Sequence, residues 1–342
     1  MPEGGSEFER IAALLAALPA GEGVVVGPGD DAAVLRPRDG RDLVATTDAF
    51  VEGRHFRRDL LTPAEAGARL AVANLSDLAA MAAEPRWALL SFVVPAAWSQ
   101  AECMLLERAS ARMLAADGAA IVGGNLAAAE GPFSATLALL GEVERGAAWR
   151  RAGARAGDVI AVTGFPGSAA AFTALALRGD PPSRARVPAA IVERVVAPAS
   201  RVRLARALAA TGAVRAAIDV SDGLAADLAH LCDASLVGAR IDEGLLPADA
   251  ALHDAARALS ALAGQDGGLL TRLRLGASDD YELLLSIEAS KWTDCERVAH
   301  ELKVPLARIG EFTRGRARVL AAASGAELPL DVPGWDHFTD RS

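Results

Sequence analysis

Lysine is nearly absent from this 342-residue chain, and its scarcity excludes two familiar kinds of nucleotide site. Only Lys291 and Lys303 occur, and neither follows a glycine. A P-loop needs a lysine directly after a glycine, and a protein-kinase site needs a catalytic lysine on a strand. We therefore exclude both a P-loop and a protein-kinase site.

Cysteines and long hydrophobic runs are also scarce. Cys103, Cys232 and Cys295 lie far apart and form neither a disulfide framework nor a metal knuckle. No uninterrupted apolar span reaches membrane length, and the N-terminus lacks the basic start of a secretory signal. We expect a soluble protein of the reducing cytoplasm, with no membrane partner.

Positive charge is outnumbered, because 35 lysines and arginines oppose 44 aspartates and glutamates and leave a net charge of −9. Broad contact with nucleic acid depends on clustered lysine and arginine, so we expect no nucleic-acid partner. The length allows a large buried core and favours two domains over one.

The most informative stretch is Gly27-Pro28-Gly29-Asp30-Asp31-Ala32-Ala33-Val34, a glycine turn followed by two adjacent carboxylates and an apolar run. Adjacent aspartates repel each other, and near a core they need a cation or backbone N–H donors. A hard metal ion is a suitable cation, whereas a solvated turn is the simpler alternative. The metal interpretation gains weight because aspartates recur beside apolar segments at Asp48, Asp77, Asp219, Asp222 and Asp279-Asp280.

Two of these aspartates fall in predicted regular structure. The strand that ends at Asp48 places Thr46 on the same face and Thr47 on the other, and its hydroxyl and carboxylate oxygens suit Mg²⁺. A capping box at Thr62–Glu65 predicts the start of a helix. Along it, Asp77 either lies on the inward apolar face or caps a second helix, and the residues alone leave both open.

Glycines mark another candidate position near the end of the first half. A short strand over residues 119–122 runs into Gly123-Gly124-Asn125, where two glycines allow a ligand close to the backbone, although a tight turn explains them equally well. The stretch 145–157, rich in Gly, Ala and Arg, then precedes a new cycle of strand and helix. We therefore predict an N-terminal domain of residues 1–146 and a C-terminal domain of residues 147–342.

In the second half, a strand over residues 214–220 carries Asp219 at its end, and Ser221 is the expected N-cap of the next helix. A helix start with serine and glycine suits a phosphate, while Asp219 and Asp222 are placed to bind its metal. Capping alone explains Ser221 and Asp222 but leaves Asp219 at the end of an apolar strand unexplained.

The pattern also predicts structure at the two ends of the chain. Apolar spacing predicts a first helix over residues 6–18, and a final strand is expected near residues 307–309. The tail contains Trp335 in a chain otherwise poor in aromatic residues, and such a ring either packs on the domain or covers a flat ligand.

The motifs taken in order resemble one family over essentially the whole chain, the thiamine-monophosphate kinases. The matching motifs are G-P-G-D-D-A-A-V at 27–34, T-T-D at 46–48, G-R-H-F at 53–56, N-L-S-D-L-A-A-M at 74–81, R-A-G-A-R-A-G-D at 151–158, D-V-S-D-G-L at 219–224, D-D-Y-E-L at 279–283 and G-W-D-H-F at 334–338.

That resemblance implies a two-domain α/β fold of layered α+β character, of the aminoimidazole-ribonucleotide-synthetase type, in a homodimer whose N-terminal domains pair. It implies a kinase that transfers phosphate from ATP to thiamine monophosphate, yielding ADP and thiamine diphosphate, with several Mg²⁺ ions. The implied metal ligands are Asp30, Thr46, Thr47, Asp48, Asp77, Asn125, Asp219 and Asp222, the implied ATP contacts are Gly124, Arg151 and Ser221, and the implied substrate contacts are His55, Asp279 and Trp335.

The residue chemistry agrees with this reaction. ATP and a phosphate monoester bring much negative charge together, and metal ions bridging carboxylates and phosphates neutralise it where basic residues are few. The acceptor phosphate is largely ionised near neutral pH, so no strong general base is needed. We expect direct in-line transfer without a phosphoenzyme, driven by positioning and charge neutralisation.

Two positions depart from the family pattern. Asn125 stands where the family has aspartate, which replaces an anionic metal ligand by an amide, and Asp279 stands where it commonly has glutamate. Two alternatives follow, namely another ATP-using synthetase of the same superfamily, or a nucleotide-binding protein that has lost turnover. The absence of an N-terminal reactive cysteine and of a terminal cysteine argues against two such synthetases.

Overall fold

The computed structural model describes residues 21–28, 30–263 and 268–335, and the helix expected over residues 6–18 lies outside them. The chain divides into two compact units. The first comprises Met1–Leu78, Ala83–Ala148 and Val196–Val202, and the second comprises Ala79–Ala82, Trp149–Val195 and Arg203–Ser342. The main division therefore lies two residues beyond the boundary expected at 146/147, and one short segment rejoins the first unit.

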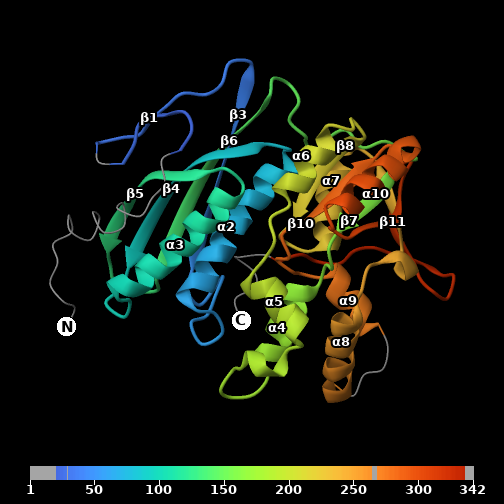
Figure 1. The fold of residues 1–342 in the computed structure, drawn as a ribbon. Coiled ribbons are helices and arrows are strands. Elements are labelled where there is room, and N and C mark those ends of the chain that lie inside the picture. Colours follow the sequence, from blue (N-terminus) through green and yellow to red (C-terminus); the bar gives the residue numbers. More distant parts are fainter. Residues whose placement is uncertain (1–20, 29, 264–267, 336–342) are drawn as a thin grey trace. The chain divides into compact units, whose positions relative to one another are not determined.

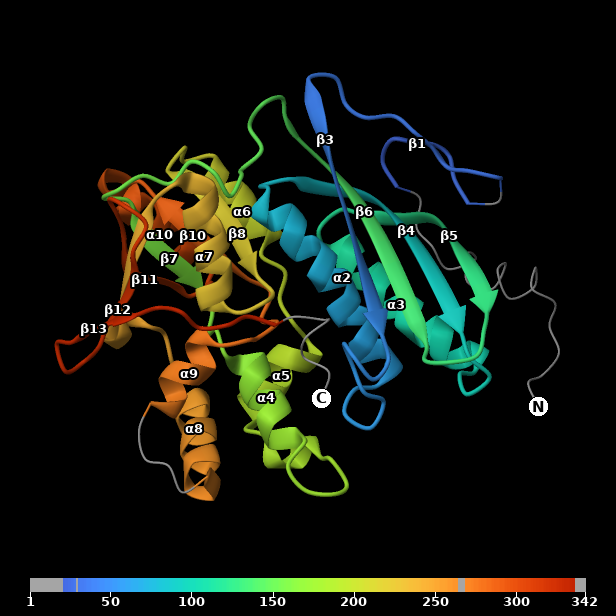
Figure 2. The same cartoon turned by 180° about the vertical axis from the view of Figure 1, so that it is seen from behind.

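The first unit is built on a four-stranded sheet in the order β3-β6-β4-β5, with two helices on one face. Figure 2 shows the strands in front and α2 and α3 behind them, and among the described residues no helix lies on the other face. A small ribbon of two strands precedes the sheet. The elements are β1 (Val24–Val26), β2 (Val34–Leu35), β3 (Arg41–Val51), α2 (Pro63–Ala80), β4 (Glu84–Val94), α3 (Gln100–Ala116), β5 (Ala120–Ala128) and β6 (Ser134–Glu144).

Both helices begin with a capping box, of which the one at Thr62–Glu65 was predicted from the sequence. The Thr62 hydroxyl accepts a hydrogen bond from the Glu65 backbone N–H, and the Glu65 carboxylate accepts one from the Thr62 N–H at 2.8 Å. Ser99 and Glu102 repeat this arrangement at the start of α3. Because α2 continues without a break to Ala80, Asp77 lies within a single helix and does not cap a second one.

The two faces of the sheet differ in burial, and the register of the strands assigns each side chain to one of them. Along β3, Thr46 and Asp48 are half-buried while Thr47 and Ala49 are exposed, which is the alternation of a strand with one covered face. We call the covered side, which contains Asp48, the helix-side face. The other side, which contains Thr47, is the open face.

The second unit contains a seven-stranded sheet in the order β13-β12-β9-β11-β7-β10-β8, antiparallel except for the pair β12 and β9. Helix α7 packs on this sheet above a core of leucine, isoleucine and phenylalanine. The strands are β7 (Val159–Thr163), β8 (Val214–Val220), β9 (Gly238–Asp242), β10 (Glu282–Ile287), β11 (Leu306–Thr313), β12 (Arg318–Ala321) and β13 (Glu327–Pro329).

Further helices of this unit group away from the sheet, where α4, α8 and α9 pack together (Figure 1). Among the described residues, no helix is both long and apolar enough to cross a membrane. The remaining helices are α4 (Ser168–Ala176), α5 (Ala189–Val196), α6 (Val202–Ala209), α7 (Leu224–Ser235), α8 (Ala250–Ala263), α9 (Leu269–Leu275) and α10 (Trp292–Glu301).

Two expectations about strands were wrong. The strand at residues 119–122 does not end at the glycines but continues as β5 to Ala128, with a bulge in its pairing to β4. The strand near residues 307–309 is not the last, because β12 and β13 follow it. The sequences of β5, β12 and β13 show little alternation of polar and apolar residues, so they do not resemble half-buried strands.

Candidate active site

Three of the predicted metal ligands lie together on the helix-side face of the first unit. The Thr46 hydroxyl on β3 donates a hydrogen bond to the Asp77 carboxylate on α2. Asp48 follows two residues later on the same face of β3, close enough to Asp77 for the two charges to repel. Two carboxylates and one hydroxyl form a set of hard oxygen donors, which is the set that Mg²⁺ prefers.

The charge balance of this group favours a bound cation. Burial, with the repulsion from Asp77, raises the pKa of Asp48 to about 6. Within the part of the chain that the structure describes, no arginine, lysine or hydrogen-bond donor is paired with the Asp48 carboxylate. The residues therefore fit a divalent cation, whose charge would offset the cost of two nearby desolvated carboxylates.

Other predicted ligands of the first unit lie on the open face. Asn125 pairs with Ser91 across β5 and β4, and Ser91 is joined through β6 to Ala49, which places Asn125 on the same side as Thr47. Asp30 is exposed, and its carboxylate accepts a hydrogen bond from the Asp31 backbone N–H at 2.9 Å. The predicted ligands of this unit thus form two groups on opposite faces of one sheet.

Gly124 has a structural explanation that its sequence context did not reveal. It lies in the middle of β5, opposite Leu90 of β4. A Cβ atom at this position would lie 1.8 Å from the Leu90 carbonyl oxygen, so any side chain would force the strands apart. Glycine is therefore required by the sheet, and its predicted contact with ATP stays a prediction.

His55 is held by its own loop next to an aromatic cluster. Its Nδ1 accepts a hydrogen bond from the Val51 backbone N–H at 3.0 Å, and its ring stacks on Phe50 with centroids 5.5 Å apart. Because Nδ1 is an acceptor, a neutral imidazole carries its proton on Nε2. That N–H group would be the hydrogen-bond donor of the ring.

In the second unit, the turn after β8 is organised by a residue that the sequence reasoning missed. One oxygen of Asp227 accepts hydrogen bonds from the backbone N–H groups of Ser221, Asp222 and Gly223, at 3.1, 3.2 and 3.1 Å. Asp227 lies one turn inside α7, and the spacing Ser-x5-Asp was the available signal. Burial and the charge of Asp222 raise its pKa to about 7, although the three N–H donors lower it.

This arrangement corrects the expected role of Ser221. Helix α7 begins at Leu224 with Gly223 as N-cap, so Ser221 is not the capping residue. The backbone N–H groups expected to bind a phosphate already bind the Asp227 carboxylate. The Ser221 hydroxyl, rather than the local backbone, is left for a predicted contact with ATP.

The two adjacent aspartates Asp279 and Asp280 have different roles. The Asp280 carboxylate accepts hydrogen bonds from the backbone N–H groups of Gly167 and Ala169 at 2.6 and 2.9 Å, and thereby caps the start of α4. Burial raises the pKa of Asp280 to about 6. Asp279 is half-buried and stays the predicted substrate contact of the pair.

Several predicted residues of the second unit meet around the end of β8. Asp219 is buried on β8 opposite Leu283, and the Tyr281 backbone N–H bonds to the Val220 carbonyl at 2.9 Å, which places the segment before β10, with Asp279, alongside. The Trp335 backbone N–H donates to the Asp222 carbonyl at 3.1 Å. Sequence positions 219, 222, 279 and 335 are therefore brought into one neighbourhood.

Arg151 lies on a segment that runs beside β8. The Arg150 carbonyl accepts a hydrogen bond from the Ala217 N–H at 3.0 Å, and the Arg151 carbonyl accepts one from the Ser235 hydroxyl at 2.8 Å. These backbone contacts leave the exposed Arg151 guanidinium available. Among the described residues, the His, Cys, Asp and Glu side chains form no group of three that could hold a metal by themselves.

Known protein families and individual relatives match most of the chain. The family described as "AIR synthase related protein, N-terminal domain" matches residues 29–143, and the corresponding C-terminal domain family matches residues 155–322. The chain is 34% identical to the thiamine-monophosphate kinase of Escherichia coli strain K12 over 318 residues, which covers 92% of each chain. The chain belongs to the thiamine-monophosphate kinase family. It is also 34% identical to the Caulobacter vibrioides kinase over 337 residues, covering 97% of this chain and 91% of that protein.

Solved structures of this family share the fold. The thiamine-monophosphate kinase of Stenotrophomonas maltophilia K279a is 32% identical, with a TM-score of 0.79, covering 93% of this chain and 96% of that one. The structure described as "AaThiL complexed with AMPPCP and TMP" is 26% identical, with a TM-score of 0.73 and 89% of each chain covered. The two-domain AIR-synthase-type fold predicted from the motifs is confirmed.

We expect Asp48→Asn to change both stability and metal response. With the pKa of Asp48 raised to about 6, its contribution to the stability of the metal-free protein is fully present below about pH 4, and up to about 3 kcal/mol of it is lost as pH rises through 6. Mg²⁺ needs the ionised form, so its stabilising effect grows over the same range. Thermal unfolding with and without Mg²⁺ should therefore show a larger Mg²⁺ shift at about pH 8 than at about pH 5, and Asp48→Asn should abolish this difference.

Asp39→Asn, at an exposed position of the same unit, is the matched control and should behave as wild type. Equal Mg²⁺ shifts at both pH values in the wild type would contradict a metal role for Asp48.

Asp227→Ala should destabilise the second unit and weaken nucleotide binding. It leaves three backbone N–H groups without their acceptor, which we expect to cost about 2–3 kcal/mol, whereas Asp227→Asn retains an acceptor oxygen and should cost less. The measurements are chemical denaturation and the KM for ATP. Asp233→Asn, on the exposed side of the same helix, serves as control, and a wild-type KM in Asp227→Ala would refute the assigned role of the turn.

Proposed function

We propose that this protein transfers the γ-phosphate of ATP to thiamine monophosphate, giving thiamine diphosphate and ADP. The observation that carries the proposal is the match over nearly the whole chain to thiamine-monophosphate kinases, together with a related structure described as containing AMPPCP and TMP. The organisation of the second unit supports it, since the predicted nucleotide and substrate residues meet at the end of β8.

The residues divide into positioning roles. Thr46, Asp48 and Asp77 would hold one Mg²⁺ ion on the helix-side face of the first unit. Asp219 and Asp222 would hold another beside the turn after β8. Asp30, Thr47 and Asn125 contribute from the open face, Gly124, Arg151 and Ser221 contact ATP, and His55, Asp279 and Trp335 contact thiamine monophosphate.

The chemistry needs little from individual side chains beyond charge and position. When bound, Mg²⁺ supplies the positive charge that offsets the phosphate and carboxylate oxygens. The acceptor phosphate has a second pKa of about 6 and is already a nucleophile near neutral pH. Asp48 and Asp77 would orient the phosphates.

Trp335 and His55 would select the thiamine part of the acceptor. Trp335 is 38% exposed and is held by its backbone beside Asp222, so an aromatic ring lies next to the predicted nucleotide residues. A cationic thiazolium ring is attracted to such a face. The Nε2–H of His55 offers a hydrogen-bond donor in the first unit.

A second candidate is a nucleotide-binding protein without turnover, and Asn125 is the residue that favours it. An amide in place of a carboxylate leaves one metal with one negative ligand fewer. Similarity to hydrogenase maturation protein HypE, at 21% identity and a TM-score of 0.77, reflects the shared fold alone.

Product analysis tests the proposed function directly. Pure protein incubated with Mg-ATP and thiamine monophosphate should form thiamine diphosphate and ADP in equal amounts, whereas free thiamine offered in parallel should give none. ATP binding without any thiamine diphosphate would instead identify the silent nucleotide binder. Asn125→Asp is the informative variant, because it restores the missing charge and should tighten Mg²⁺ binding without being required for turnover.

The open face of the first unit supports a homodimer formed by these units. Leu43, Leu89 and Val93 are 51%, 41% and 39% exposed, and the strand register puts all three on this face. Large exposed aliphatic side chains on one surface mark a contact site, and a second copy would cover them with the same surface.

Leu89→Glu should therefore convert the dimer into a monomer, because a carboxylate would be buried against apolar groups. Light scattering coupled to gel filtration measures the mass. Leu105→Glu places the same change on the exposed side of α3, where Leu105 is 49% exposed, and should leave the mass unchanged. A Leu89→Glu protein with wild-type mass would refute this interface.

A cytoplasmic location is also proposed. All three cysteines are free thiols, which suits a reducing compartment. Fractionation of cells expressing the chain at its natural level would test it.

A further inference from the structure

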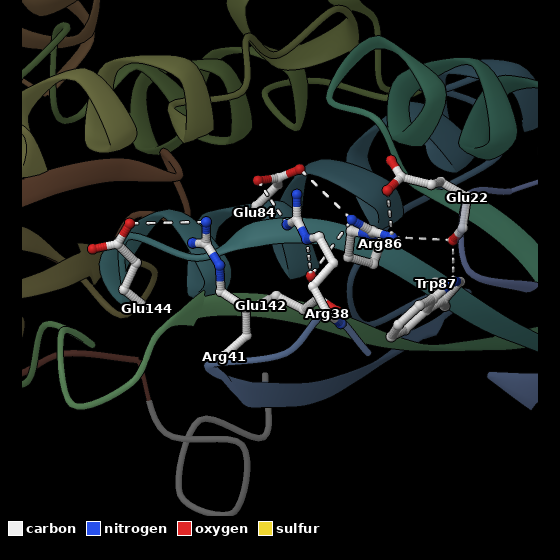
Figure 3. A network of polar contacts seen from close by, with 8 residues as sticks. All are labelled: Glu22, Arg38, Arg41, Glu84, Arg86, Trp87, Glu142 and Glu144. Carbon is white, nitrogen blue, oxygen red and sulfur yellow. Dashed lines mark hydrogen bonds and ion pairs between the residues drawn. The ribbon is translucent and has the colours of Figure 1, made fainter. Parts of the chain in front are cut away.

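A network of buried charges links the acidic segment to the sheet of the first unit (Figure 3). We define the acidic segment as residues 22–38, of which all but Gly29 are described. The network consists of Arg38 from the segment, Glu84 and Arg86 from β4, and Glu142 from β6. Figure 3 shows these side chains converging between the strands, with Glu22 and Trp87 at one side.

The network holds the far end of the segment first. The Arg38 backbone N–H donates to the Glu142 carboxylate at 2.8 Å, and its Nε donates to the other oxygen at 2.5 Å. The Arg38 Nη2 lies 2.9 Å from Glu84. A single residue therefore fixes the end of the segment through both its backbone and its side chain.

The near end of the segment is held by Arg86 and Trp87 of β4. The Glu22 carbonyl accepts hydrogen bonds from Arg86 Nη2 at 3.2 Å and from Trp87 Nε1 at 2.9 Å. Arg86 also lies 3.4 Å from Glu142, which connects the two anchoring points. Both ends of the acidic segment therefore depend on one connected set of charges.

Between these ends, the segment is held by a small two-stranded ribbon and its apolar contacts with the sheet. Its regular structure is limited to β1, three residues long, and β2, two residues long, and a ribbon of that size is marginal alone. Val24, Ala33 and Leu35 pack against Trp87 and its neighbours, while the opposite side of the ribbon is exposed.

Two of the four anchoring charges are removed from water, which makes their geometry selective, whereas the Arg38 and Glu84 side chains are 33% and 20% exposed. The side chains of Arg86 and Glu142 are 3% and 0% exposed. A desolvated ion pair tolerates little displacement, because any separation leaves a buried charge without its partner. Arg41 and Glu144 form the contrasting pair nearby, 3.8 Å apart, with the Glu144 side chain 76% exposed.

We propose that Arg38, Arg86 and Glu142 are positioning residues for Asp30, because they fix both ends of the acidic segment on the sheet that also carries Asp48. This inference rests on the proposed role of Asp30 as a Mg²⁺ ligand. Glu142 pairs with Leu43 on β3, and Asp48 is five residues further along that strand, a distance of about 17 Å. The network therefore fixes the acidic segment on the open face of the sheet, whose helix-side face carries Asp48.

Arg38→Met tests the far anchor, and Trp87→Phe removes only the Nε1–H donor at the near anchor while keeping an aromatic ring. The matched control is Arg41→Met, which deletes an arginine from the exposed pair without touching the acidic segment. Three quantities are measured for each, namely amide hydrogen exchange in β1 and β2, Mn²⁺ affinity by electron paramagnetic resonance, and the separate KM for Mg-ATP and kcat.

Arg38→Met should speed amide exchange in the ribbon about tenfold and weaken Mn²⁺ binding about tenfold, and each tenfold change corresponds to about 1.4 kcal/mol. It should also raise the KM for Mg-ATP more than it lowers kcat. Trp87→Phe should change the same quantities by less than Arg38→Met does. Arg38→Lys should bring them closer to their wild-type values, and Arg41→Met should change none of them. Asp30→Asn should weaken Mn²⁺ binding without altering exchange.

Faster exchange with unchanged Mn²⁺ affinity and KM would overturn the proposal, since the network would then be structural only. Unchanged exchange in both anchor variants would overturn it as well, and so would wild-type Mn²⁺ affinity in Asp30→Asn. Exchange and Mn²⁺ binding do not depend on turnover. Failure of the wild type to form thiamine diphosphate would therefore refute the proposed function while leaving the anchoring of the segment to be decided by these two measurements.

Discussion

Negative charge taken out of water is the constraint that organises both units. The chain satisfies its buried carboxylates in different ways. Asp227 and Asp280 accept hydrogen bonds from backbone N–H groups, and Glu142 is paired with two arginines. Asp48 has neither kind of partner among the described residues and faces a second carboxylate. This difference separates carboxylates whose partners lie within the fold from Asp48, for which we propose a Mg²⁺ partner.

The same distinction explains how far the sequence could predict the structure. Capping boxes at Thr62 and Ser99 are local signals, and both helices begin there. The ordered acidic motifs were sufficient for the family and the two-domain fold. Local patterns could not tell Asp279 from Asp280, or show that Asp227 rather than Ser221 organises the turn before α7, because those roles depend on which N–H groups the fold brings near.

Sheet geometry accounts for the other differences. Gly124 looked like part of a ligand-binding turn, yet the close approach of the Leu90 carbonyl explains it without a ligand. Thr46 and Thr47 are adjacent in sequence but lie on opposite faces, so a motif of three residues serves two environments. The strand register that decides this is set by pairing with β6, which is distant in the chain and leaves no trace in the motif itself.

The segment before β7, which contains Arg151, also affects aggregation. Strand β8 is the last strand of the seven-stranded sheet, and an unpaired edge can recruit a strand from another molecule. The backbone of Arg150 bonds to Ala217 of that strand, and Gly153 lies so close to the Arg215 carbonyl that a Cβ would come within 2.3 Å. The backbone that presents Arg151 therefore also covers part of this edge. A substitution of the Arg151 side chain would leave the edge covered, whereas a deletion in this segment would expose it.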